Sequence, residues 1–129
     1  MKKFFLLVIV VMGLTACHEN LNERAAREAQ EFTKKSCPRE ISEGIIIDSM
    51  TFDKATETGC YYYKLSGVLY TTLTDEMKEQ TKELMLDGVR NTPTLKVYKD
   101  AGFGFHYIFR SQKDKKKVLL DYNFTKKDY

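Results

Sequence analysis

Apolar residues recur at helical spacing in two stretches of the chain. The first predicts an amphipathic helix over residues 22–36, in which charged positions surround a stripe of Leu21, Ala25, Ala29 and Phe32. Cys37-Pro38 ends this helix. The second helix is predicted to begin at a cap, Thr72 or Thr74, and to reach about Asp87, with an apolar stripe of Leu73, Met77, Leu84 and Gly88.

Four further stretches have the composition or the two-residue alternation of β-strands. The segments 44–54 and 60–65, separated by a polar turn, predict one hairpin, with Tyr61, Tyr63 and Leu65 on its buried side. A second hairpin is predicted from the alternation in 103–110 and 118–124, whose inward residues are Phe103, Phe105, Tyr107, Phe109, Val118, Leu120, Tyr122 and Phe124.

The segment 93–101 fits two interpretations. Leu95 and Val97 alternate as in a strand, whereas Thr92, Pro93 and Gly102 stand where a short helix has its cap, first residue and end. The helix is favoured. The whole pattern then predicts an α+β domain with the order α-β-β-α-(short α)-β-β, built as a four-stranded antiparallel sheet with the two main helices on one face.

The N-terminus has the layout of a secretion signal. Basic Lys2 and Lys3 precede an apolar run over residues 4–12, which is too short to span a bilayer as a helix. The following Leu14-Thr15-Ala16-Cys17 resembles the lipobox of bacterial lipoproteins, which implies cleavage after residue 16 and a lipid on Cys17; ordinary secretion with a free Cys17 is the alternative. We therefore expect a signal at 1–16, a lipidated tether at 17–21 and one domain at 22–129.

The cell envelope is the compartment that this N-terminus implies. His18 follows the cysteine in place of the aspartate that retains some lipoproteins at the inner membrane, so the outer membrane is favoured, with the leaflet left open. In an oxidising compartment, Cys37 and Cys60 are expected to form a disulfide.

Charge and side-chain chemistry argue against several classes of function. Without Lys2 and Lys3, the 21 basic and 18 acidic residues become 19 and 18, a net charge of +1, and the only basic run left lies at 113–117, so nucleic-acid binding is not expected. The only histidines are His18 in the tether and His106 on a strand. We expect no catalytic residues, no metal site and no cofactor.

The outer face of the predicted sheet offers a candidate interaction surface. Tyr62, Ile108 and Leu119 point away from the helices in the predicted alternation, and their apolar area would mark an interface with a protein partner or a second copy of the chain.

The order of elements resembles a family of small bacterial envelope proteins without a characterised function. The matching features are Cys37-Pro38, the strands 45–54 and 61–65, Gly102 with Phe105-His106-Tyr107, and the ending 123–129; the chain lacks a cysteine after Asp128 that many such proteins carry. The resemblance implies a fold and no activity.

The expected function is that of a lipid-anchored, non-enzymatic envelope binding module whose ligand is unknown. The alternative is an inhibitor or immunity-type protein that acts against a cell-wall hydrolase or toxin. It rests on Ser66-Gly67-Val68-Leu69-Tyr70, which resembles the SGxxY pattern of lysozyme-inhibitor lipoproteins at three positions. Those inhibitors resemble all-β barrels, which the two predicted helices do not fit.

Overall fold

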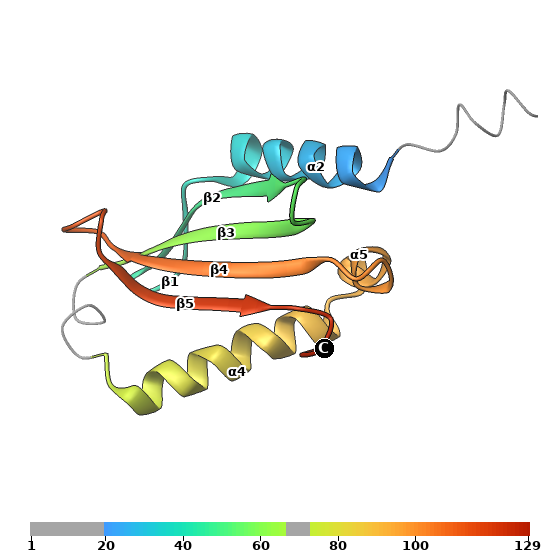
Figure 1. Cartoon of the computed structure of the whole chain (residues 1–129). Coiled ribbons are helices and arrows are strands. Elements are labelled where there is room, and N and C mark those ends of the chain that lie inside the picture. The colour runs from blue at the N-terminus through green and yellow to red at the C-terminus, as the bar shows by residue number, and fades with distance from the viewer. Residues whose placement is uncertain (1–19, 67–72) are drawn as a thin grey trace, which may run out of the picture.

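A computed structural model describes residues 20–66 and 73–129 of the chain. Five strands form one sheet in the order β1-β2-β3-β4-β5 (Figure 1), with bounds Arg39–Ser42, Ile45–Asp53, Thr58–Leu65, Gly104–Ser111 and Val118–Phe124. Neighbouring strands are antiparallel except β3 and β4, which are parallel. The fold is therefore α+β with a mostly antiparallel sheet.

The prediction of a four-stranded antiparallel sheet was wrong in two respects. It missed β1, whose four residues are all exposed and include only one apolar side chain, Ile41, so that no alternation marks the strand. It also made the central pair antiparallel. The segment that contains α4 (Asp75–Asn91) joins β3 to β4, and a helical crossover of this kind lets the two strands lie parallel.

Both main helices begin at the caps that their sequences favour. In α2 (Leu21–Ser36), Asn20 Oδ1 accepts a hydrogen bond from the Asn22 N–H at 2.9 Å. In α4, Thr74 is the cap rather than Thr72, and its hydroxyl accepts from the Met77 N–H at 3.2 Å.

In residues 20–66 and 73–129, no helix combines the length and the hydropathy that crossing a membrane requires.

The segment after α4 is helical, as predicted. A 3-10 turn, η1 (Pro93–Leu95), starts with its proline in the first turn, and α5 (Lys96–Asp100) follows directly. Tyr98 of α5 is buried. Gly102 adopts a φ of +79°, a left-handed conformation that reverses the chain into β4 at little steric cost to glycine.

One face of the sheet forms an aromatic core with the helices. The rings of Tyr63 and Phe109 stack at 4.6 Å between centroids, as do those of Tyr61 and Tyr107. The residues predicted to point inward are buried or pack against the buried cluster, except Val118, which is exposed; Ile47 of β2 is also buried and was not predicted. The core lies between this face and the buried residues of the helices, which are Ala25, Ala29, Leu86, Val89 and Tyr98.

The two long helices lie beside opposite margins of the sheet, α2 next to β2 and α4 next to β5 (Figure 1). The Thr33 hydroxyl of α2 donates to the Met50 carbonyl at 2.9 Å and accepts from the Met50 N–H at 2.8 Å. β1 pairs only with residues 45–47 of β2, so no strand covers that edge of β2 at Met50. The Thr33 hydroxyl takes the place of a strand there and satisfies the backbone N–H and carbonyl of Met50.

An apolar groove between two helices

The gap between α2 and α4 leaves a groove over the inner face of the sheet, with a volume of about 590 Å³. Its floor is made by Tyr61, Tyr63 and Tyr107, from the centre of the sheet. The two walls come from the helices, through Ala25, Glu28 and Phe32 of α2 and Leu84, Met85 and Gly88 of α4. The groove is therefore a largely apolar surface that the protein does not cover with its own described residues.

The prediction of which residues of α4 are buried was wrong at the residues that form this wall. Leu84 and Gly88 were expected in the buried stripe, but Leu84 is 66% exposed and the buried residues of α4 are Leu86 and Val89. The reason is the rotation of the helix: Leu86 and Val89 meet the sheet, while Leu84 and Gly88, one turn apart, line the groove. A Cβ added at Gly88 would meet no atom within 4 Å.

The floor tyrosines are neutral groups that can both donate and accept hydrogen bonds. Within residues 20–66 and 73–129, the hydroxyls of Tyr61, Tyr63 and Tyr107 have no hydrogen-bond partner. Burial raises the pKa of Tyr63 to about 12, and it also raises the pKa of the other two phenols. An occupant of the groove would therefore find three uncharged polar groups on an otherwise apolar floor.

A hydrogen-bonded cluster joins α2 to α5 at the side of the groove. The Tyr98 hydroxyl donates to Glu28 Oε2 at 2.5 Å, and Arg24 Nε donates to Glu28 Oε1 at 2.9 Å. Burial acts to raise the pKa of Glu28, but the hydrogen bonds from Tyr98 and Arg24 and the nearby positive charge outweigh it, so the pKa is lowered. Burial first, and then the Glu28 carboxylate, raise the pKa of Tyr98 to about 12. Glu28 is therefore ionised at neutral pH.

The predicted interaction face is only partly assembled on the outer side of the sheet. Tyr62 and Ile108 are neighbours across β3 and β4, but Ile108 is buried and the Arg110 guanidinium lies 5.5 Å from the centroid of the Tyr62 ring. Leu119 lies where a β-bulge interrupts the pairing of β4 and β5, and it packs against the buried cluster. The role of these three residues as an interface stays a prediction.

Polar side chains also gather on the same outer face. Cys60 and His106 are paired across β3 and β4, and His106 Nε2 contacts Asp121 Oδ1. Burial raises the pKa of the Cys60 thiol, which disfavours the nucleophilic thiolate. In the described part of the chain, no three Cys, His, Asp or Glu side chains are close enough to hold a metal ion.

The expected disulfide is absent, and both described cysteines are free thiols. Cys37 packs against the buried cluster on the inner side, next to Tyr63. Cys60 alternates with the inward Tyr61 and therefore lies on the outer face of β3. The two sulfurs are on opposite sides of the sheet, so the bridge cannot form without moving β3.

Three predictions concern parts of the chain outside the described residues. These are the signal at 1–16, the lipidated Cys17 with most of its tether, and Gly67 to Tyr70 of the SGxxY pentapeptide. They stay predictions.

Comparison with known proteins places the fold. None of the curated proteins matches the sequence. A protein from Pseudomonas aeruginosa described as secreted has 12% sequence identity and a TM-score of 0.67, over 86% of this chain and 97% of its own. The type II secretion system pilotin EpsS from Vibrio vulnificus has 13% identity and a TM-score of 0.65, over 84% of this chain and 90% of its own. For the pilotin AspS from Vibrio cholerae, the identity is 15% and the TM-score 0.64, over 85% and 93%.

At these identities the similarity to solved structures shows a shared fold and nothing more. The sequence itself gives the family. Residues 20–120 match the domain of unknown function DUF8479, and the chain therefore belongs to that family.

Proposed function

We propose that this protein is a lipid-anchored module of the cell envelope that binds a helical segment of a protein partner in the groove between α2 and α4. The groove itself carries the proposal. Its two walls are helices, its floor is aromatic, and Leu84 stands 66% exposed at its margin. An amphipathic helix that lays its apolar side into a hydrophobic groove is a recurring mode of protein recognition.

The composition of the groove favours a protein segment over a small polar substrate. Glu28 is the only charged residue among the described residues that line the groove, and it is already bound by Tyr98 and Arg24, so none of them offers a free charged side chain to hold a small polar substrate. The absence of a side chain at Gly88 lets another backbone approach α4 closely. These features support a binding module and not an enzyme.

The location of the proposed module rests on Cys17 and on the fold. A lipidated Cys17 would hold the domain at a membrane, and the residue after it, His18, favours the outer membrane. Two of the proteins with this fold are pilotins of type II secretion systems. By analogy with these pilotins, we propose that the partner of this chain is a component of a membrane-bound assembly and not a soluble ligand.

The test is a crosslinking pull-down from envelope extracts with the lipid-anchored protein and two single variants. Leu84→Glu places a charge in the groove, and Tyr62→Glu places the same charge on the outer face. Burying the remaining two-thirds of the Leu84 side chain would contribute about 1–2 kcal/mol, so its loss weakens binding roughly 5- to 30-fold.

A partner lost with Leu84→Glu and kept with Tyr62→Glu supports the groove. The reverse pattern would move the interface to the outer face. A partner that both variants retain would refute both sites.

A further inference from the structure

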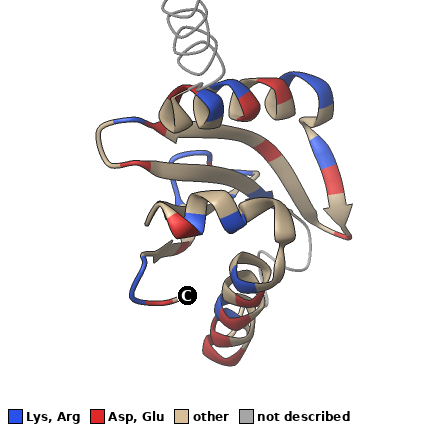
Figure 2. Cartoon of the chain, turned by 90° about the vertical axis from the view of Figure 1, so that its right-hand side faces the viewer, with Lys and Arg blue, Asp and Glu red and all other residues tan. Residues whose placement is uncertain are grey.

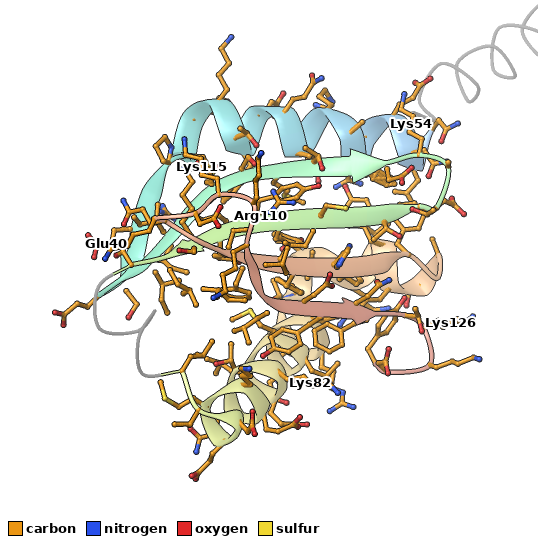
Figure 3. All side chains as sticks on the ribbon, turned by 60° about the vertical axis from the view of Figure 1, so that its left-hand side comes forward. Glu40, Lys54, Lys82, Arg110, Lys115 and Lys126 are labelled. Atoms are coloured by element: carbon orange, nitrogen blue, oxygen red, sulfur yellow. The ribbon has the colours of Figure 1, made fainter. Side chains whose placement is uncertain are left out.

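Several basic side chains lie at the end of the molecule where the described chain begins. The first turns of α2, the short helix α5 and the turn after β5 share this end (Figure 1), and Arg24 of α2 lies 5.9 Å from the centroid of the Tyr98 ring in α5. Figure 3 shows Lys54 and Lys126 at this end and Lys115, in the β4–β5 turn, at the opposite one. The end-on view shows the basic turn after β5 beside the C-terminus, below α2 and α5 (Figure 2).

Arg90 and Lys99 are held in place by hydrogen bonds that leave their charges unneutralised. Together with Lys96, they line a surface pocket of about 420 Å³. Arg90 Nη2 donates to the Asp128 carbonyl at 2.7 Å, and Lys99 Nζ donates to the Arg90 carbonyl at 2.8 Å. Because a backbone carbonyl carries no net charge, both side chains keep their positive charge available to an anion.

The remaining charges of this end do not cancel the excess. Lys96 forms an ion pair with Asp100 at 2.8 Å, but both side chains are largely exposed, so solvent screens the pair. The segments 53–57, 90–100 and 126–128, which lie at this end, together carry six basic and four acidic side chains. Their net charge is +2, and the turn 113–117 at the opposite end carries +3, so the position of the lipid anchor, and not the charge alone, selects the end that faces the membrane.

We propose that Arg90, Lys96, Lys99 and Lys126 form a docking surface for the phosphate headgroups of anionic lipids, in the membrane that holds the lipid on Cys17. This inference rests on the proposed lipid anchor. Three residues separate Cys17 from Leu21 at the start of α2, and the four extended steps between these two residues reach at most about 14 Å. The anchor therefore keeps this basic end near the headgroups continuously, which gives them a high effective concentration.

An anionic surface attracts each nearby Lys or Arg strongly enough to change binding about five-fold. Four such side chains would orient the domain, with α5 and the turn after β5 toward the lipid and the β4–β5 turn away from it. The groove would then stand upright from the membrane, between α2 and α4.

The test uses the lipidated protein reconstituted in vesicles and a water-soluble amine-reactive reagent, with the labelling of each lysine measured by mass spectrometry. We expect the labelling of Lys96, Lys99 and Lys126 to fall several-fold when phosphatidylcholine vesicles are replaced by vesicles that contain phosphatidylglycerol. Lys113, Lys115 and Lys116, at the far end, provide the internal reference and should label equally on both. In 1 M salt the protection should disappear, because the Debye length falls to about 3 Å.

A pair of charge variants makes the assignment specific. Lys96→Gln with Lys126→Gln should remove the protection of Lys99, whereas Lys113→Gln with Lys115→Gln should leave it unchanged. Equal labelling on both kinds of vesicle, or protection that persists in 1 M salt, would overturn the inference. Protection that 10 mM inorganic phosphate abolishes at constant ionic strength would assign the pocket to a small anion instead and overturn the membrane role.

Failure of the anchor would look different from failure of the docking surface. A protein that is not acylated on Cys17 would not stay with the phosphatidylcholine vesicles, which carry no net charge to attract it. A retained protein with unprotected lysines contradicts only the docking surface.

Discussion

Replacing Gly88 by alanine should make the protein more stable. Gly88 lies within α4, where glycine is less favourable than alanine by about 0.8–1 kcal/mol in a helix interior. A new Cβ would meet nothing within 4 Å, so no steric repulsion offsets the gain. Because the position is in the last turn of the helix, we expect an increase of about 0.5–1 kcal/mol in the free energy of unfolding, or roughly 2–4 °C in Tm.

Urea and thermal unfolding followed by circular dichroism measure this change, and Gly102→Ala is the matched control. The Cβ of that variant would also fit, 3.6 Å from Lys126 Cδ, but Gly102 has a φ of +79°. The control should therefore lose about 1 kcal/mol or more through backbone strain alone. A Gly88→Ala protein that is less stable than the wild type would refute the view that α4 leaves this position open.

The same substitution separates stability from binding. If a partner helix packs closely on α4, the methyl group of Gly88→Ala should weaken the captured complex while the domain becomes more stable. If the wild type and the Gly88→Ala variant capture equal amounts of the partner, the segment bound in the groove does not approach Gly88.

Three further predictions concern contacts within the fold. Thr33→Val should destabilise the domain by about 1–3 kcal/mol in urea unfolding because it leaves the backbone of β2 without partners, and Thr33→Ser should restore most of the loss. Tyr98→Phe should reduce stability modestly, because it removes the hydrogen bond to Glu28. Since the folded-state pKa of Glu28 is lowered, the stability difference from wild type should be full above about pH 5 and should shrink as the pH falls through that pKa. A stability difference that grows in acid would contradict this. Thiol titration of the unfolded, unreduced protein should find both Cys37 and Cys60 reactive, whereas a disulfide would leave neither.

The alternation in the strands was the strongest guide to the fold. Tyr61, Tyr63, Phe105, Tyr107 and Phe109 lie on the inner face because every second residue of a strand points the same way, which a sequence reveals directly. The direction of β4 beside β3 is not encoded in either strand, so a pattern of two hairpins cannot distinguish a parallel from an antiparallel centre. β1 carries no pattern at all, since both of its faces are exposed.

The groove could not be predicted for a related reason. Periodicity identifies Leu84 as part of an apolar stripe, but it does not say whether that stripe meets the sheet of its own chain or is left open. The glycine one turn later was the available signal, because a helix rarely keeps glycine where alanine fits. The alternation also places Cys60 on the outer face, since it directly precedes the inward Tyr61 in β3, but the inner position of Cys37, which rules out the disulfide, comes only from the structure.

The parallel contact between β3 and β4 also sets the order in which the chain can fold. Each hairpin closes between neighbouring segments, whereas Thr58 pairs with Gly104 only after α4 has bridged the distance along the chain. Contacts between segments far apart in sequence form slowly, because the loop between them must be closed first. We therefore expect two early hairpins that join late, and until they join, the edges of β3 and β4 are open to pairing with other chains.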